Sequence, residues 1–116
     1  MISLMIYNPG DVILINYPYT SAKASKKRPA VIISNADYND IRNEFVAMPI
    51  TSQMDRTDYP GDTVLLDWKE TGLRKPGITK GILFTLEELI IDKLIGQLTI
   101  RDLQNIRISL REIFKI

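Results

Sequence analysis

The sequence predicts a mainly β fold: a small, strongly bent antiparallel barrel with one α-helix at the C-terminus. Two observations lead to this expectation. Five or six short segments rich in β-branched and aromatic residues follow one another and are separated by polar turns. One later segment, roughly residues 99–114, instead carries apolar residues at helical spacing. With 116 residues and no internal repeat, the chain is expected to form one domain over residues 1–116.

Composition excludes several kinds of chemistry. The chain has no cysteine and no histidine, so it lacks thiolate nucleophiles, a Ser-His-Asp triad and the usual zinc ligands. The formal net charge is +1, so binding to nucleic acid would depend on a local patch. No segment approaches the roughly 18 apolar residues of a membrane span, and residues 1–7 are too short for a signal peptide. We expect a cytoplasmic protein without a metal or other cofactor.

Three strands are expected in the first half of the chain. Residues 12–17 are dense in β-branched and aromatic side chains. Residues 30–33 are apolar at every position, which is typical of a strand buried on both faces. Residues 44–50 form the third strand, and Pro49 indicates its end or a bulge because proline cannot donate a ladder hydrogen bond. Residues 35–40 are rich in turn formers and have room for one helical turn.

The second half continues with shorter segments. Residues 63–66 are expected to be a fourth strand. Residues 78–86 are expected to be a fifth, with a bulge or sharp bend at Gly81. Residues 89–98 are expected to end in a short strand. Trp68, in the connection before the fifth strand, is expected to cover the core rather than to stack on a ligand.

The sequence predicts both the start of the C-terminal helix and its apolar face. Thr99 to Asp102 resembles a capping box in which aspartate replaces the usual glutamate. Three arginines, Arg101, Arg107 and Arg111, are expected on the solvent side. Helical spacing places five apolar side chains on one face, and we expect them to pack on the core: Leu103, Ile106, Leu110, Ile113 and Phe114.

A basic stretch marks the first candidate binding site. Residues 23–28 are expected to form a cationic loop that leads into the buried second strand. Pro29 fixes its own φ and favours an extended conformation at Arg28, so the guanidinium would sit on a stiff support. Its planar fork suits a phosphate or a carboxylate, and Lys26 and Lys27 would contact flanking phosphates. This stretch alone also allows a solvated arginine beside a strand.

Two further polar stretches are candidates. Thr51, Ser52 and Gln53 directly follow the third strand, where hydroxyls and an amide can cap a turn, bind a ligand or do both. Arg74 and Lys75 lie in a second basic turn, between two glycines. That turn is either a solvated loop or a second set of anion contacts.

Four motifs, in this order along the chain, resemble the MazF/PemK family of toxin–antitoxin endoribonucleases. The resemblance spans nearly the whole chain, and the order of the motifs makes it more specific than any one of them. The motifs are Gly10-Asp11-Val12-Ile13, then residues 27–34, then Pro49-Ile50-Thr51-Ser52-Gln53, and finally residues 72–76 followed by 82–86, 94–98 and the helix.

The resemblance implies an SH3-like barrel that forms a homodimer. It implies cleavage of single-stranded RNA, such as mRNA, without metal, leaving a 2′,3′-cyclic phosphate and a 5′-hydroxyl. It also implies a cognate antitoxin whose extended C-terminal segment covers the RNA groove. The family's catalytic arginine and threonine match Arg28 and Thr51. The expected RNA-binding residues are Lys26, Lys27, Ser52, Gln53, Arg74 and Lys75.

The late strand departs from the family pattern. Many members carry an acidic residue and then an Arg-Thr-Ile-Asp run there, whereas this chain has Phe84-Thr85-Leu86-Glu87. A general acid and base are therefore not identified, and Asp11 and Glu44 are the carboxylates closest to the expected site in sequence. The departure favours one alternative, a catalytically silent or protein-targeting barrel that binds an antitoxin or another partner. General binding of RNA or DNA through the two basic turns is a third reading, which the near-neutral charge disfavours.

Overall fold

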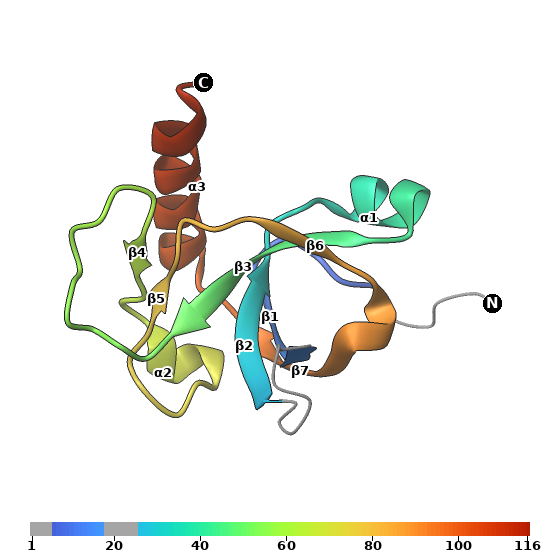
Figure 1. Cartoon of the computed structure of the whole chain (residues 1–116), viewed down its shortest axis with the longest axis horizontal. Coiled ribbons are helices and arrows are strands. Elements are labelled where there is room, and N and C mark those ends of the chain that lie inside the picture. Colours follow the sequence, from blue (N-terminus) through green and yellow to red (C-terminus); the bar gives the residue numbers. More distant parts are fainter. Residues whose placement is uncertain (1–5, 18–25) are drawn as a thin grey trace.

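A strongly bent antiparallel sheet dominates the computed structural model, which describes residues 6–17 and 26–116 (Figure 1). The strands follow the order β4-β5-β3-β2-β1-β7, and β6 pairs with β3. Among the described residues no pairing joins β4 to β7, so the sheet is barrel-like without being closed. The strands are β1 Asp11–Tyr17, β2 Lys26–Ile32, β3 Phe45–Thr51, β4 Thr63–Val64, β5 Ile78–Thr79, β6 Phe84–Leu86 and β7 Ile91–Gln97.

The apolar parts of the three central strands, β1, β2 and β3, are buried on both faces. Alternate residues along them enter two separate hydrophobic clusters. Ile13 and Ile32 belong to the first cluster, and Val12 and Val31 belong to the second, each fully buried. A bent sheet covered on both sides explains the apolar runs within these strands, and it confirms the predicted burial of the run that begins at Ala30.

The start of β2 differs from the prediction. Lys26 to Arg28 are paired with β1 as part of the strand, Arg28 opposite Ile15 and Lys26 opposite Tyr17. The predicted cationic loop is wrong for these three residues, and its remainder, 23–25, lies outside the described residues. Hydrogen-bond pairing with β1 continues from the apolar run back to Lys26. The strand therefore begins earlier than its apolar residues indicate.

The predicted fifth strand is two strands, β5 and β6, interrupted at Gly81. A side chain at Gly81 would meet the backbone of Gly61 at 3.0 Å, so only glycine allows this close crossing. Gly81 N also donates to Asp62 Oδ1 at 2.7 Å. After this break β6 pairs with the first half of β3, where Phe84 lies opposite Ala47 and packs on the first hydrophobic cluster.

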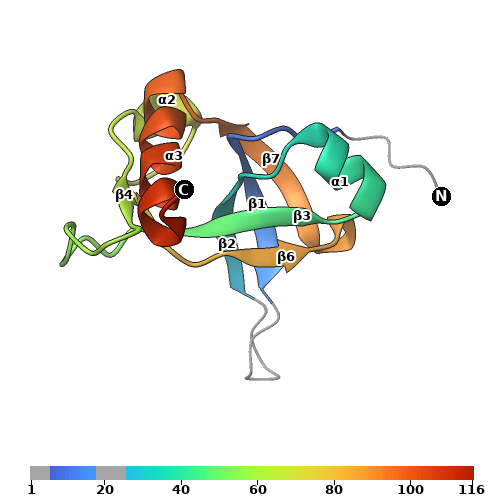
Figure 2. The same cartoon turned by 90° about the horizontal axis from the view of Figure 1, so that it is seen from above.

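Three helices and one 3-10 turn connect or cover the sheet: α1 Ala36–Arg42, α2 Trp68–Thr71, α3 Ile100–Phe114 and η1 Glu88–Ile90. Helix α1 is longer than the single turn expected, and it is capped by Asn35, whose side chain accepts from Tyr38 N at 2.8 Å. Trp68 packs on the second cluster, as predicted. Helices α1 and α3 lie at opposite ends of the sheet (Figure 2). No helix in the described part of the chain combines the length and hydrophobicity that a membrane crossing requires.

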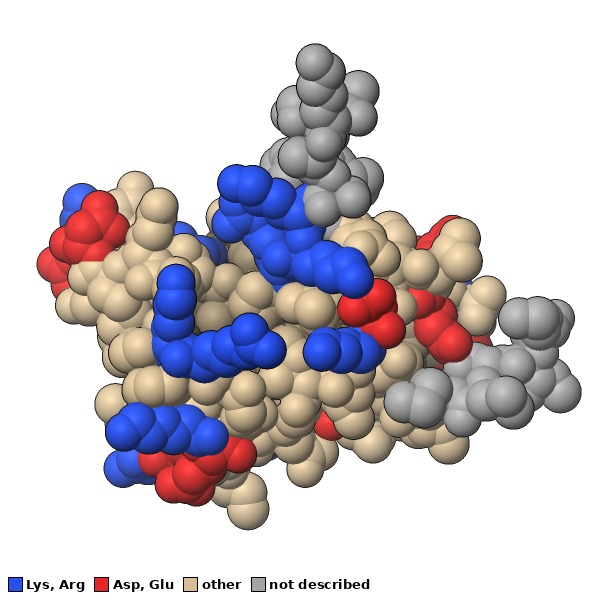
Figure 3. Space-filling view, turned by 90° about the horizontal axis from the view of Figure 1, so that it is seen from below, with Lys and Arg blue, Asp and Glu red and all other residues tan. Residues whose placement is uncertain are grey.

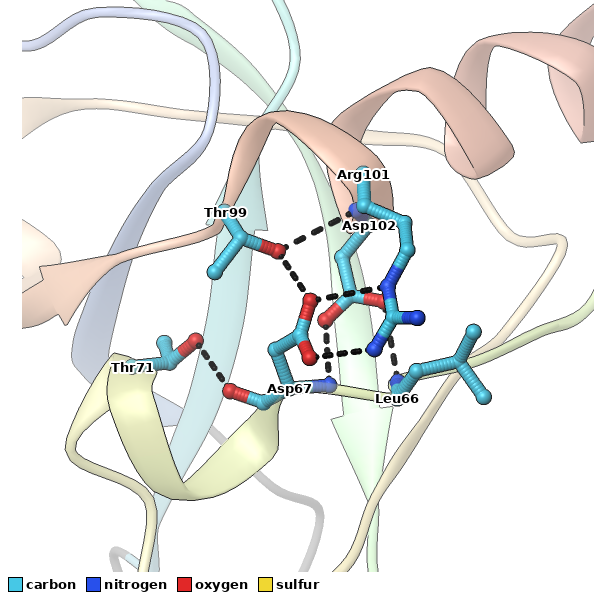
Figure 4. A network of polar contacts seen from close by, with 6 residues as sticks. All are labelled: Leu66, Asp67, Thr71, Thr99, Arg101 and Asp102. Carbon is cyan, nitrogen blue, oxygen red and sulfur yellow. Dashed lines mark hydrogen bonds and ion pairs between the residues drawn. The ribbon is translucent and has the colours of Figure 1, made fainter.

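Helix α3 begins as predicted, with one correction. The Thr99 side chain caps the helix by accepting from Asp102 N at 3.3 Å. Asp102 does not complete a capping box. Its buried carboxylate instead accepts from Leu66 N and Asp67 N, each at 2.9 Å (Figure 4). The helix is therefore fixed to the connection before α2, because Asp102 satisfies two backbone donors there.

The apolar face of α3 is only partly covered. Ile106 is fully buried, and Leu103 and Leu110 pack on the second cluster. Ile113 and Phe114 are 36% and 52% exposed, so their predicted packing on the core is wrong. The reason is length: the C-terminal end of α3 extends past the sheet (Figure 1).

Candidate nucleic-acid interface

The candidate site opens where β3 changes its partner. Up to Pro49 the strand pairs with β2, with Ala30 opposite Pro49. Its last two residues pair with β5 instead, Ile50 opposite Thr79 and Thr51 opposite Ile78. Strand β3 therefore continues through Pro49, where the sequence predicted its end or a bulge, and diverges from β2 at that residue.

The divergence leaves a cleft of about 640 Å³ between three segments of the chain. The start of β2 forms one wall, the end of β3 forms the second, and the turn after α2 forms the third. The cleft is lined by Lys26, Lys27, Arg28, Pro29, Ile50, Thr51, Ser52, Gln53, Leu73, Arg74, Lys75, Pro76 and Gly77.

Glycines bring the third wall close to the sheet. Helix α2 ends at Gly72, which adopts φ +94° and donates its N–H to Lys69 O at 3.2 Å. This left-handed end turns the chain towards the cleft. A side chain at Gly77 would meet Ile50 Cγ2 at 2.9 Å, so this glycine permits the return to β5 against the end of β3.

The cleft is cationic. Five of its lining residues carry positive charge: Lys26, Lys27, Arg28, Arg74 and Lys75. None of the described lining residues is acidic. One of the five, Lys27, also forms an ion pair with Asp92 at 3.3 Å. Lys and Arg side chains gather on the face seen from below (Figure 3).

Hydroxyl and amide groups stand beside these charges. Thr51 is half-buried and Ser52 and Gln53 are exposed. Thr51 Oγ1 accepts from Gln53 N at 3.2 Å, so its hydroxyl hydrogen remains available to a ligand in the cleft. Hydroxyl donors beside arginine and lysine suit the oxygens of a phosphodiester. In chemical terms, the cleft can bind an anionic chain and stabilise charge on a phosphate.

All eight residues that the sequence put forward as catalytic or RNA-binding line this one cleft. Neither carboxylate considered with them does. Asp11 is buried at the other end of β1, where it accepts from Asn8 N and Gln97 Nε2. Glu44 precedes the other end of β3 and pairs with Arg42 at 2.9 Å. Within the described residues, no group of three or more acidic side chains is arranged to hold a metal ion.

Sequence reasoning missed part of the surroundings. Leu73, Pro76 and Gly77 line the cleft although only their basic neighbours were singled out. A second hollow beside the cleft is lined by residues that the sequence passed over as ordinary loop, among them Arg56 and Tyr59. Exposed loop residues carry no periodic signal, so only the fold shows that they meet the end of β3.

The fold and the cleft together define a small β protein equipped to bind a polyanion. The chain belongs to the family of PemK-like, MazF-like toxins of type II toxin–antitoxin systems, whose sequence model matches residues 8–114. No curated protein matches the sequence.

Solved structures of toxins share the fold. A MazE–MazF complex from Deinococcus radiodurans (form II) superposes with a TM-score of 0.79 at 18% identity, covering 97% of this chain and 98% of the other. Form III of the same complex gives 0.76 at 20% identity, covering 97% and 99%. An endoribonuclease in complex with its cognate antitoxin, from a mycobacterial species, gives 0.74 at 17% identity, covering 96% and 95%. At these identities the likeness shows the fold alone, and the match to the family model confirms the resemblance read from the sequence.

Proposed function

We propose that this toxin is a sequence-selective endoribonuclease that cleaves single-stranded RNA without a metal. The observation that carries the proposal is the convergence of three cleft walls. Arg28, Thr51 and the basic turn with Arg74 come from segments far apart in the chain, yet they line one cationic hollow. Membership of a family that includes endoribonucleases supports the same activity.

The proposed reaction uses the substrate's own nucleophile. The ribose 2′-oxygen attacks the adjacent phosphorus, and its proton passes to water. The bond from phosphorus to the 5′-oxygen breaks, and that oxygen takes up a proton. The products are a 2′,3′-cyclic phosphate and a 5′-hydroxyl. The protein has to hold the ribose in line and stabilise the growing negative charge.

Three side chains have roles in that reaction. Arg28 donates to the non-bridging phosphate oxygens, where charge grows in the transition state. Thr51 donates to the same phosphate or orients the ribose, and Ser52 lies beside it. Each acts as a preorganised hydrogen-bond donor, and removing one such donor typically costs about 10²- to 10³-fold in rate.

The remaining lining residues contact the strand on either side. Lys26, Lys27, Arg74 and Lys75 neutralise neighbouring phosphates, and Gln53 can hydrogen-bond a base edge or a ribose. These contacts fix the register of the strand, and the phosphate contacts make binding salt-dependent.

Partners follow from the same cleft. We expect a cognate antitoxin that carries acidic side chains and covers the cleft, since the fold is shared with toxins solved in complex with antitoxins. We also expect a homodimer that acts on mRNA in the cytoplasm.

The test is RNA cleavage in the presence of EDTA by wild-type protein, Arg28→Ala and Arg107→Ala. Arg107 is an exposed arginine of α3 and is not among the cleft residues, so its loss controls for removal of one surface charge. Fragment ends are mapped chemically. We expect cleavage at a short recurring sequence, with cyclic phosphate ends, in wild type and Arg107→Ala, and about 10²-fold less in Arg28→Ala. Full cleavage by Arg28→Ala would reject the assignment of this arginine.

One observation favours a second function, a catalytically silent or protein-targeting barrel. No described lining residue of the cleft is a carboxylate that could serve as general base, and Phe84, at the family's arginine position, is half-buried against the first hydrophobic cluster. Such a protein would bind its partner through the same cationic cleft. Absence of cleavage by well-folded wild-type protein over varied RNAs, with intact antitoxin binding, would favour this function.

A further inference from the structure

A second hollow of about 320 Å³ opens next to the cleft. We call it the Tyr59 pocket; it is lined by Thr51, Gln53, Asp55, Arg56, Tyr59 and Lys80. Thr51 and Gln53 line the cleft as well. Because the two hollows share these residues, an extended strand with a phosphate at Thr51 can place its neighbouring nucleotide in the Tyr59 pocket. The volume lies near the lower end of the roughly 300–1,000 Å³ typical of small-ligand sites.

The two hollows differ in chemistry. The cleft presents five cations and no described acidic residue, which suits phosphate oxygens. The Tyr59 pocket combines an aromatic ring, an amide and the carboxylate of Asp55 with two cations. A carboxylate disfavours a phosphate but can accept from the amino group of a base, as aspartate does with cytosine in nucleic-acid complexes. The Tyr59 pocket therefore suits a base rather than the backbone.

Tyr59 has the features of a stacking platform. The residue is 52% exposed, so part of it is accessible at the surface. Arg56 Cζ lies 4.5 Å from the ring centroid and Lys80 Nζ lies 5.7 Å from it. Aromatic rings and guanidinium planes are the two surfaces on which proteins stack unpaired bases.

Hydrogen bonds and an ion pair hold the turn that carries Tyr59. Residues 59–62 form a turn in which Asp62 N donates to Tyr59 O at 3.0 Å and Gly61 adopts φ +88° after Pro60. The Asp62 carboxylate, almost fully buried, accepts from Lys80 Nζ at 2.5 Å and from Gly81 N at 2.7 Å. The turn that carries Tyr59 is thus tied to the segment that carries Lys80, and little ordering is needed when a ligand binds.

We propose that the Tyr59 pocket binds one unpaired nucleobase of the RNA strand, stacked on Tyr59 next to the scissile phosphate, and sets the base preference at that position. The inference rests on the proposed ribonuclease function, because that function places the scissile phosphate at Arg28 and Thr51. Gln53, Asp55 and Arg56 surround the base and read its edge.

The test compares Tyr59→Leu with Tyr38→Leu. Tyr38, on α1, also lies under an arginine, with Arg42 Cζ 5.6 Å from its ring centroid, but it lines neither hollow. Binding is measured by fluorescence anisotropy with a labelled single-stranded RNA whose 2′-hydroxyls are replaced by fluorine, so that it cannot be cleaved. Cleavage sites on natural RNA are mapped in parallel. Thermal unfolding checks that each variant is folded.

We expect Tyr59→Leu to weaken binding roughly 5- to 100-fold and to relax the base preference at one position only. Tyr38→Leu is expected to match wild type, and Tyr59→Trp, which keeps an aromatic face, to retain both affinity and preference. If wild type cleaves RNA and Tyr59→Leu shares its affinity and its cleavage sites, the base pocket is refuted and the ribonuclease function stands. If wild type binds the probe through Tyr59 but cleaves nothing, the base pocket is supported and the proposed cleavage is refuted.

Discussion

At the scale of single residues, a substitution at Thr51 can lower the cleavage rate with little effect on the free energy of unfolding. Its side chain is half-buried, and its hydroxyl oxygen accepts one hydrogen bond, from Gln53 N at 3.2 Å. Thr51→Val keeps the shape of the side chain and removes the hydroxyl donor. We expect cleavage to fall about 10²-fold, with the free energy of unfolding changed by less than about 1 kcal/mol.

Rates of RNA cleavage and urea denaturation curves measure the two effects. Thr57→Val is the matched control, because Thr57 is an exposed threonine of the same loop and lines neither hollow. Equal cleavage rates for Thr51→Val and wild type would remove Thr51 from the proposed mechanism.

Eight residues singled out from the sequence line one cleft, whereas Ile113 and Phe114, two α3 side chains expected to pack on the core, are exposed. Arg28 lies just before the apolar run of β2, and Thr51 is the last residue of β3. Local composition changes sharply at both places, so the sequence marks them. Asp102 could not be assigned correctly because its partners, Leu66 N and Asp67 N, lie 36 and 35 positions earlier. Nothing near Asp102 in the sequence indicates that these two donors would need an acceptor.

At the scale of elements, an ion pair between the exposed Arg101 and the largely buried Asp67 adds to the contacts of Asp102 that join the start of α3 to the connection before α2. Arg101 Nη2 donates to Asp67 Oδ1 at 2.5 Å, and Thr99 Oγ1 donates to Asp67 Oδ2 at 2.6 Å (Figure 4). The hydrogen bond from Arg101, and after it the one from Thr99, lowers the pKa of Asp67 below its ordinary value. The ionised form of Asp67 therefore stabilises the folded state relative to the unfolded state.

The sign of the pH effect follows from that lowered pKa. Asp67 contributes its stabilisation above the unfolded pKa of about 4, and the contribution is lost as the pH falls through the folded pKa. We expect Arg101→Ala to be less stable than wild type at pH 7, with a difference that shrinks as the pH falls below about 4 and through the lowered folded pKa. Denaturation curves over this range measure the difference, and Arg107→Ala is the control. A difference that stays constant with pH would show that the ion pair contributes nothing.

Element boundaries show where sequence information ends. Long apolar runs predicted β1, the centre of β2 and most of β3, because buried strands in this sheet are apolar on both faces. Strands β4 and β5 have two residues each, too few for any periodicity. The change of partner at Pro49 depends on β5 and was therefore not predictable. The spacing on α3 gave the apolar face correctly but could not show how far the sheet extends along it.

At the scale of the whole molecule, the salt dependence of RNA binding tests how many cations of the cleft contact the strand. The net charge of +1 supplies no strong overall field, so the cleft has to supply the salt dependence. With five lining cations, the slope of log K against log salt is expected to reach at most about −3.5, at about −0.7 per phosphate on a single strand.

Two double variants test which cations are responsible for the slope of log K against log salt. Arg74→Gln with Lys75→Gln removes two cleft charges and is expected to reduce its magnitude by about 1.4. Arg107→Gln with Arg111→Gln removes two exposed charges of α3 and should leave it unchanged. Anisotropy titrations with the uncleavable RNA at several salt concentrations provide the values. An equal reduction by both double variants would show that the cleft is not where the strand binds.

The order of synthesis also determines when the cleft can form, because its walls come from separate segments of the chain. Its walls come from residues 26–29, 50–53 and 73–77, and strand β1 needs β7, residues 91–97, as its outer partner. A chain still attached to the ribosome with only its first half emerged carries Arg28 and Thr51 but has neither the third wall nor the last strand. The complete cleft exists only after the chain has been synthesised at least to residue 97, so a shorter growing polypeptide lacks a finished site while its own messenger RNA is still being translated.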